Sequence, residues 1–194
     1  VDAVGDHRGD YQFRLINIAN ADQIEAGAVV TGTLETGGRE SDLFQFEAVA
    51  GQELFLDAQT KSGGTAYWQL VGPDGETLFG PRDFNANSDP DRFVVPKTGT
   101  YTLLREGYIY NSADLSYSFA LNEVTDVVRA VALDQVIEGN VTAPGQRNKL
   151  TFSLATDTQV FFDTLNASGL RVTLNGPRGV EFGPQDLRYS DWQY

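Results

Sequence analysis

The chain has 194 residues, of which 41% are hydrophobic and 21% charged, so it holds enough apolar material for one or two globular cores. Its net charge of −13 predicts that it repels phosphate backbones, so we exclude nucleic acid as a partner. No apolar run approaches 18 residues, so we also exclude membrane insertion. With no cysteine and one histidine, disulfides and thiolate metal sites are excluded too. Because it begins at Val1 and contains no methionine, we interpret it as an internal segment or a processed product.

Short stretches of alternating apolar and polar residues recur along the chain, separated by turn residues, which is the pattern of strands. The clearest hairpin has Gly72–Gly75 at its turn, because the Asp-Gly pair tolerates the positive φ that such turns need. Helix is expected only as short turns near residues 21–24 or 127–133. The predicted strands are, in chain order, 42–50, 53–57, 67–71, 76–79, 93–95, 100–104 and 117–121.

An internal repeat is the most informative feature of the sequence. Phe46 and Phe152 lie 106 positions apart, and the residues around them agree in order and in apolar pattern. One unit is therefore about a hundred residues long, the size of a single sandwich domain. The matching segments are Tyr11–Leu15 with Tyr117–Leu121, Asp42–Phe46 with Asn148–Phe152, Glu53–Asp57 with Gln159–Asp163, and Gly72–Gly75 with Gly176–Gly179.

The repeat divides the chain into one whole copy and two fragments. We assign residues 1–15 to the last strand of a preceding copy, 16–123 to a complete copy and 124–194 to a partial second copy. The fold class is therefore all-β, with jelly-roll-like antiparallel β-sandwich repeats, one complete and one partial. Because the partial copy leaves strand edges unpaired, we expect something to complete it. The candidates are residues 11–15, folding back or swapped in from another chain, a segment outside this piece, or an inserted domain.

Five short motifs stand in a fixed order in the complete copy: Thr31–Leu34, Asp42–Phe46, Ala50–Leu54, Leu70–Gly75 and Thr98–Leu103. This ordered set resembles the bacterial pre-peptidase C-terminal domain family. Members of that family are similar jelly-roll-like β-sandwiches, appended to secreted peptidases or strung in tandem through surface and adhesin-like proteins. The resemblance implies an accessory, non-catalytic module that is secreted or on the cell surface. The second copy departs from the family pattern at Ala155–Thr158 and lacks the late Thr-Gly-Thr-Tyr element.

One loop has the oxygen-bearing side chains that a calcium ion prefers. These side chains occur at every second position, which gives the density of hard oxygen ligands that calcium needs. The same residue types are also favoured in any surface turn, so a plain loop is the competing interpretation. The predicted calcium ligands are Asp83, Asn85, Asn87, Asp89 and Asp91.

Exposed aromatic residues give a second candidate site. Strand alternation requires that one of Tyr67 and Trp68 faces the core and the other faces outward. The segment after residue 107 is the better candidate for contact with a glycan or another cell-surface ligand, because it lies in a loop or at a strand edge. We predict that Tyr108, Tyr110 and Asn111 contact such a ligand.

No pattern in the sequence indicates catalysis. The one histidine, His7, has no identifiable nucleophile partner, and the 27 acidic residues single out no catalytic pair. The tripeptide Arg8–Asp10, which some extracellular proteins present to integrins, is more simply a chance occurrence in a turn. The expected function is a non-catalytic spacer or adhesion module. The alternatives are a calcium-assisted carbohydrate-binding module and an accessory domain of a secreted hydrolase.

Overall fold

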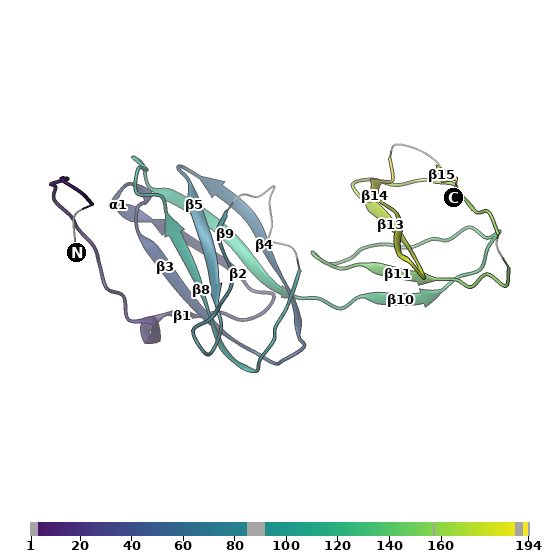
Figure 1. Ribbon diagram of the computed structural model, residues 1–194, viewed down its shortest axis with the longest axis horizontal. Coiled ribbons are helices and arrows are strands. Elements are labelled where there is room, and N and C mark those ends of the chain that lie inside the picture. Colours follow the sequence, from purple (N-terminus) through teal and green to yellow (C-terminus); the bar gives the residue numbers. More distant parts are fainter. Residues whose placement is uncertain (1–3, 85–91, 157, 189–191, 194) are drawn as a thin grey trace. The chain divides into compact units, whose positions relative to one another are not determined.

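The computed structural model describes residues 4–84, 92–156, 158–188 and 192–193 (Figure 1). Contacts divide the chain into two compact units, each formed by two segments. The first unit contains Val1–Arg129 and Gln135–Leu150, and the second contains Ala130–Asp134 and Thr151–Tyr194. Among the described residues, no helix has the length and apolar character that crossing a membrane would need.

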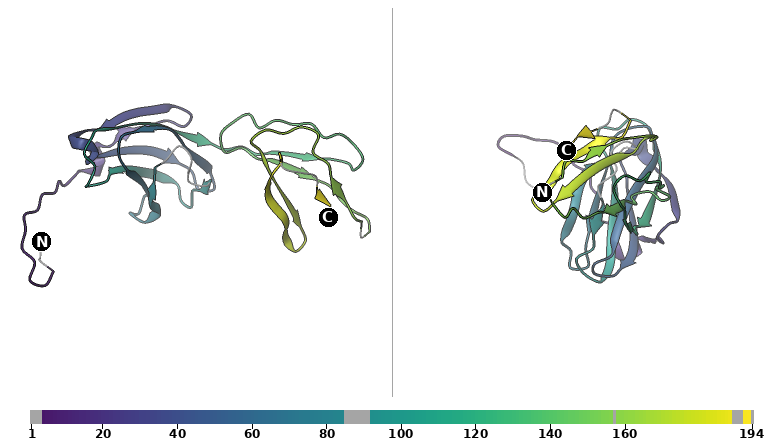
Figure 2. Two further views of the ribbon diagram at one scale, coloured as in Figure 1. Left: turned by 90° about the horizontal axis from the view of Figure 1, so that it is seen from above. Right: turned by 90° about the vertical axis from the view of Figure 1, so that its right-hand side faces the viewer.

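The first unit is a sandwich of two stacked sheets (Figure 1, Figure 2). In these two sheets, neighbouring strands are antiparallel except β1 and β3, which are parallel. The five-stranded sheet has the order β1 (Asp22–Gln23), β3 (Ser41–Ala48), β8 (Gly99–Gly107), β5 (Ala66–Val71) and β6 (Thr77–Asp83). The four-stranded sheet has the order β2 (Val29–Leu34), β9 (Leu115–Glu123), β4 (Glu53–Ser62) and β7 (Phe93–Val94).

The core lies between these two sheets, and strand alternation decides which residues enter it. In β5, Ala66, Trp68 and Leu70 are buried, whereas the residues between them are partly exposed. Trp68 makes edge-to-face contacts with Phe84 and with Phe119 of the opposite sheet, at 4.6 and 6.0 Å between ring centres. The remaining large core residues are Leu34, Phe44, Phe46, Leu54, Leu56, Val95, Tyr101, Leu103, Leu115, Tyr117 and Leu121.

The prediction of an all-β antiparallel sandwich is confirmed, and every strand predicted between residues 42 and 121 appears within one or two residues of an observed strand or inside a longer one. The expected helical turns are wrong. Residues 127–130 form strand β10, whereas the helical turns are a 3-10 turn, η1, at Ile18–Asn20 and the four-residue α1 at Glu35–Gly38. The segment 11–15, predicted as a strand, forms no strand within the described chain, and Tyr11, Phe13 and Leu15 are exposed.

The rest of the chain consists of strand pairs. The pairs are β10 (Val127–Ala130) with β11 (Asn148–Thr151), β12 (Phe161–Phe162) with β15 (Trp192–Gln193), and β13 (Arg171–Gly176) with β14 (Gly179–Asp186).

The β13–β14 hairpin repeats the β5–β6 hairpin. Leu174 pairs with Phe182 as Leu70 pairs with Phe79, and a bulge precedes each pair at the same position. Both hairpins contain a cis Gly–Pro peptide in the second strand. The internal repeat in the sequence is therefore also a repeat in backbone geometry.

Candidate functional site

Three tyrosines form a cluster at one end of the five-stranded sheet. The ring of Tyr108 lies edge-on to Tyr67, at 6.3 Å between ring centres, and to Tyr110, at 5.2 Å. Tyr108 and Tyr110 are exposed, as is Ile109 between them, while Tyr67 is half-buried. We call Tyr67, Tyr108 and Tyr110 the tyrosine cluster.

Carboxylates flank this cluster because of the strand register. Tyr67 pairs with Glu106 of β8 on one side and with Asp83 of β6 on the other. Residues directly opposite each other in antiparallel strands project from the same face of the sheet. Since Trp68 faces the core, Tyr67, Glu106 and Asp83 share the outer face, and both carboxylates are exposed.

The side chain of Asn111 fixes the loop that carries the cluster. Its amide oxygen accepts a hydrogen bond from the Thr65 backbone N–H at 2.9 Å. Its amide nitrogen donates to the backbone carbonyls of Gly38 and Thr65, each at 2.8 Å. The backbone N–H of Tyr108 also donates to the Thr65 carbonyl. Three loops are thereby joined at one amide, which orders Tyr108 and Tyr110 before any ligand arrives.

Two glycines allow this close approach of the loops. A Cβ on Gly64 would lie 2.1 Å from the amide oxygen of Asn111, and a Cβ on Gly107 would lie 1.8 Å from the carbonyl oxygen of Gly38. Neither position has room for a side chain. Glycine is therefore needed at these two positions so that the neighbouring backbone and side-chain groups can pack closely.

The repeated hairpin shows that a tyrosine on the outer face is not needed to form it. In the β13–β14 hairpin, Arg171 pairs with Asp186 where Tyr67 pairs with Asp83. Leu70 with Phe79 and Leu174 with Phe182 form the same apolar pair in both hairpins, but at the outer-face position of Tyr67 the second hairpin has Arg171. Tyr67 is therefore a feature of this copy and is not needed to form the hairpin.

The structure distributes the predicted aromatic residues between the core and the surface. Trp68 is in the core and Tyr67 faces outward, which confirms the prediction from strand alternation. Tyr108 and Tyr110 lie together on the surface, as a ligand site requires. The amide of Asn111 is engaged by backbone groups and holds the loop, and contact of Asn111 with a ligand stays a prediction.

The predicted calcium loop is described only at its start. Asp83 is exposed at the end of β6, and Asn85, Asn87, Asp89 and Asp91 lie outside the described residues. In the part of the chain that the structure describes, no three acidic or histidine side chains gather closely enough to hold a metal ion. Calcium binding by this loop stays a prediction.

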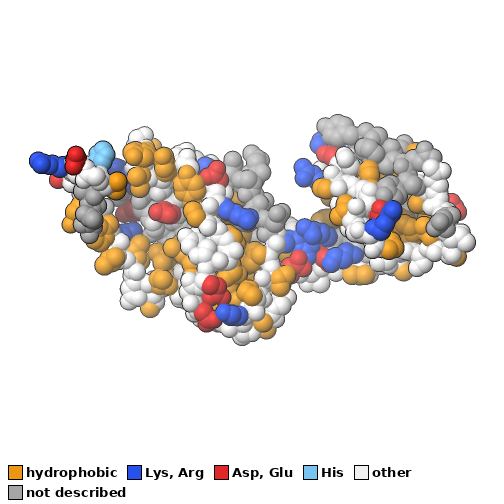
Figure 3. All heavy atoms as spheres, viewed as in Figure 1, with side chains coloured by type: hydrophobic (Ala, Val, Ile, Leu, Met, Phe, Trp, Pro, Cys, Tyr) orange, Lys and Arg blue, Asp and Glu red, His pale blue; other side chains and the backbone are white. Residues whose placement is uncertain are grey.

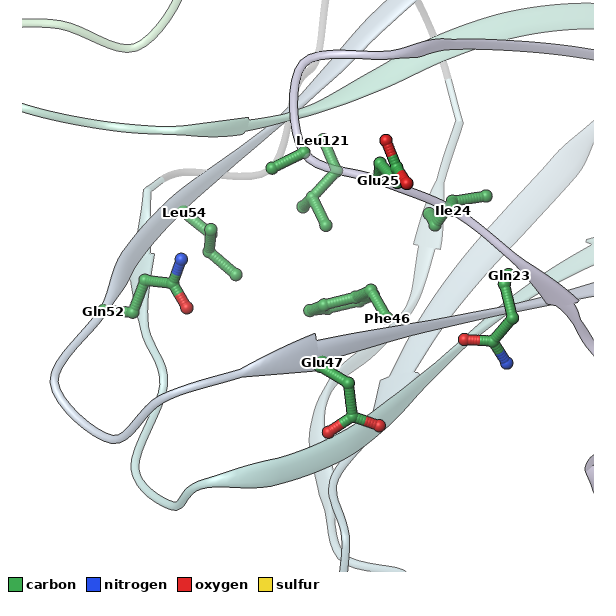
Figure 4. Close-up of a pocket in the computed structure, with 9 residues that line it drawn as sticks. Gln23, Ile24, Glu25, Phe46, Glu47, Gln52, Leu54 and Leu121 are labelled. Carbon is green, nitrogen blue, oxygen red and sulfur yellow. The ribbon is translucent and has the colours of Figure 1, made fainter.

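A hollow of about 350 Å³ opens at the other end of the sandwich. Figure 4 shows Phe46, Leu54 and Leu121 turned toward it, while Glu47 points away. Its lining combines apolar side chains of the core with two glutamines and two glutamates.

One buried residue was not anticipated from the sequence. Arg105 is fully buried, and the guanidinium nitrogens have no hydrogen-bond partner among the described residues. Burial lowers the pKa of Arg105 to about 9. Nearby, the hydroxyl of Tyr117 donates to Asp42 at 2.5 Å, and burial raises the pKa of that hydroxyl. The apolar neighbours of Arg105 in the sequence gave the only signal that it faces inward.

Exposed hydrophobic side chains are visible on both units in Figure 3. In the first unit they include Ile109, Tyr108 and Tyr110 of the tyrosine cluster. In the segment 148–165 they include Leu150, Phe152, Leu154, Phe161, Phe162 and Leu165.

Comparison with known proteins found solved structures of similar shape over about half of the chain. One is the pre-peptidase C-terminal domain of collagenase from Bacillus anthracis, with 20% identity, a TM-score of 0.44, and coverage of 53% of this chain and 95% of that one. Another is PliG of Aeromonas hydrophila, a periplasmic inhibitor of g-type lysozyme, with 13% identity, a TM-score of 0.43, and coverage of 53% and 94%. PliG of Salmonella Typhimurium has 18% identity, a TM-score of 0.38, and coverage of 53% and 98%.

No protein-family model and no curated protein sequence matches the chain. The complete copy is an all-β sandwich. The collagenase domain is a pre-peptidase C-terminal domain, the same family that the five sequence motifs resemble.

Proposed function

We infer that this chain is a non-catalytic β-sandwich repeat module of a secreted or cell-surface bacterial protein, with a spacer and adhesion role. The observation that carries this is the recurrence of one hairpin, with the same bulge, as β5–β6 and β13–β14. Repeated small domains are suited to spacing other domains apart. The net charge of −13 supports this, because like-charged copies resist collapse onto one another.

Cell-surface exposure can be tested with an antibody raised against this chain. Intact cells that make the parent protein are treated with a protease and then immunoblotted, with a cytosolic protein as the control. We expect the signal to disappear while the cytosolic control survives. Protection of both proteins until the cells are lysed would contradict a surface location.

Carbohydrate binding is the second candidate, and the tyrosine cluster favours it. Tyrosine offers a flat apolar ring and a hydroxyl, which together suit the two faces and the hydroxyl rim of a sugar. Glu106 and Asp83 can accept hydrogen bonds from sugar hydroxyls beside Tyr67. The acidic surface would repel anionic glycans, so the class we propose is neutral oligosaccharides.

The test is binding to an array of neutral oligosaccharides, followed by titration calorimetry on those retained. We expect the double variant Tyr108→Ala and Tyr110→Ala to bind at least about tenfold more weakly, the equivalent of about 1.4 kcal/mol. The matched control is Tyr11→Ala, since Tyr11 is also exposed but lies outside the cluster. Binding to no neutral glycan, or equal loss in the control, would exclude this site.

A further inference from the structure

A second hollow, of about 250 Å³, lies at the side of the sandwich where one edge strand of each sheet contributes to its lining. β6 is the last strand of the five-stranded sheet, and β7 is the last strand of the four-stranded sheet. β6 contributes Phe79 and Arg82, and β7 with the residue before it contributes Arg92, Phe93 and Val94. All of these residues belong to the first unit, so the hollow lies within one unit.

Two phenylalanines form apolar walls of the hollow. The rings of Phe79 and Phe93 meet edge-to-face, at 5.5 Å between ring centres, and this contact joins the two sheets. Both side chains are only partly buried, so part of each ring stays within reach of a ligand. An apolar cavity of about 150 Å³ accommodates benzene. The hollow therefore has room for one aromatic ring and a short group attached to it.

Arg82 places a positive charge on the same side of β6 as Phe79. In the strand register, Arg82 lies opposite Trp68. Phe79 lies opposite Leu70, and both of these partners are buried in the core. The guanidinium carbon of Arg82 lies 5.7 Å from the centre of the Phe79 ring. Arg82 is exposed and forms no ion pair with any described carboxylate, so its charge is available to a ligand.

The repeated hairpin indicates that the fold does not require this charge. In β6, Arg82 follows Phe79 by three positions. In β14, the residue three positions after Phe182 is Gln185. An uncharged side chain thus stands at the same place in a hairpin of the same register. The positive charge at Arg82 is therefore a feature of the first hairpin alone.

A second arginine borders the hollow and is held by ion pairs. The side chain of Arg92 is only 5% exposed, and its terminal nitrogens pair with Asp126, at 2.7 Å, and with Glu53. Its Nε–H group has no hydrogen-bond partner among the described residues. One buried donor of a lining residue is therefore without an acceptor, whereas the carboxylates beside Arg92 are already engaged. These charges leave the hollow suited to an acceptor group.

We propose that this hollow binds a small aromatic carboxylate, whose ring packs against Phe79 and Phe93 and whose carboxylate pairs with Arg82. The planar guanidinium matches the two oxygens of a carboxylate, and a flat ring matches the aromatic walls. The net charge of −13 repels anions at long range, but at physiological ionic strength this field decays over about 8 Å. The direct contact with Arg82 therefore decides the affinity. The proposal does not depend on the adhesion role or on the tyrosine cluster.

NMR titration of the chain with three probes tests the ligand class at constant ionic strength. Phenylacetate carries both ring and charge, phenylacetamide carries the ring alone, and acetate carries the charge alone. We expect phenylacetate to shift the backbone amide signals of Phe79, Arg82, Phe93 and Val94. It should bind at least about tenfold more tightly than either of the other two probes, because a hydrogen bond to a charged group is worth more than a neutral one.

Arg82→Gln separates ligand recognition from folding, because the second hairpin already has glutamine at this place. We expect this variant to bind phenylacetate at least about tenfold more weakly, with its affinity for phenylacetamide and its thermal midpoint unchanged. The control is Arg8→Gln, at an exposed arginine that does not line the hollow. Equal affinity for phenylacetate and phenylacetamide, equal loss of affinity in the control, or no binding at millimolar concentrations would overturn the proposal.

Discussion

The guanidinium carbon of Arg105 lies 3.3 Å from the centre of the Phe84 ring, and the ring centre of Tyr117 is 4.1 Å away. The cation is therefore in contact with two aromatic rings within the core, an arrangement that stabilises the charge by up to about 2 kcal/mol per desolvated contact. Its N–H groups, by contrast, have no hydrogen-bond partner among the described residues, which costs free energy in a buried site.

The ring contacts of Arg105 and its unpartnered N–H groups have opposite effects on stability, and together they predict how Arg105→Met changes the free energy of unfolding. Methionine keeps most of the volume of the side chain and removes the buried donors, so we expect the free energy of unfolding to stay equal or rise by about 1 to 2 kcal/mol. Arg105→Ala should instead lower it by about 2 to 4 kcal/mol, because a cavity remains. Urea unfolding of both variants checks this. A loss in Arg105→Met as large as in Arg105→Ala would show that the ring contacts dominate.

Asn111→Ala should destabilise the complete copy by about 2 to 3 kcal/mol. Three hydrogen bonds disappear, and the Thr65 backbone N–H loses the acceptor that Asn111 provides. Urea unfolding measures the loss, with Asn20→Ala as an exposed control that should change stability by less than about 0.5 kcal/mol. The same variant should weaken any ligand of the tyrosine cluster. Unchanged stability would mean that the amide does not hold the loops.

Acid should weaken the structure around Asp126. This carboxylate accepts a hydrogen bond from Arg92 at 2.7 Å and also contacts Lys149 at 2.9 Å, and these partners hold its pKa well below the usual range. A carboxylate whose pKa is depressed on folding contributes its stability above the unfolded pKa, near 4, and loses it as pH falls. The thermal midpoint of the chain should therefore exceed that of Asp126→Asn at pH 6, and this difference should shrink progressively as pH falls below about 4 towards the depressed pKa. A constant difference across this range would contradict the assignment.

Calcium should raise the thermal midpoint if the loop from Asp83 to Asp91 binds it. At a calcium concentration fiftyfold above Kd, the linkage amounts to about 2.3 kcal/mol, or roughly 5 to 9 °C for a chain of this size. Differential scanning calorimetry in calcium and in excess chelator measures this, with Asp83→Asn as the site variant and Asp134→Asn as the control. Equal thermal midpoints in calcium and in chelator would show that the loop does not bind calcium.

The strands and most of the core followed from the sequence because they depend on local alternation. The β5–β6 hairpin, for example, combines a period of two with an Asp-Gly turn, and both signals act within a dozen residues. The edge strand β2 was not among the predicted strands, since Val29–Leu34 alternates small and polar residues with few large apolar ones.

The candidate site was only half predictable. Tyr108 and Tyr110 stood out as aromatics in a loop, but their contact with Tyr67 depends on β5 and β8 lying side by side, a pairing of residues about 40 positions apart. The same is true of Asn111, whose partners are Gly38 at the end of α1 and Thr65 in the loop between β4 and β5. Sequence alone could not show that this amide was already occupied.

The shared hairpin has a consequence for any string of such copies. The Leu–Phe pair and the bulge are the same in both hairpins, while one outer-face position carries tyrosine in the first hairpin and arginine in the second. Selection can therefore change what each copy presents without altering how it folds. A tandem array could then engage several different ligands at once, and individually weak contacts would gain strength from the high local concentration that covalent linkage imposes.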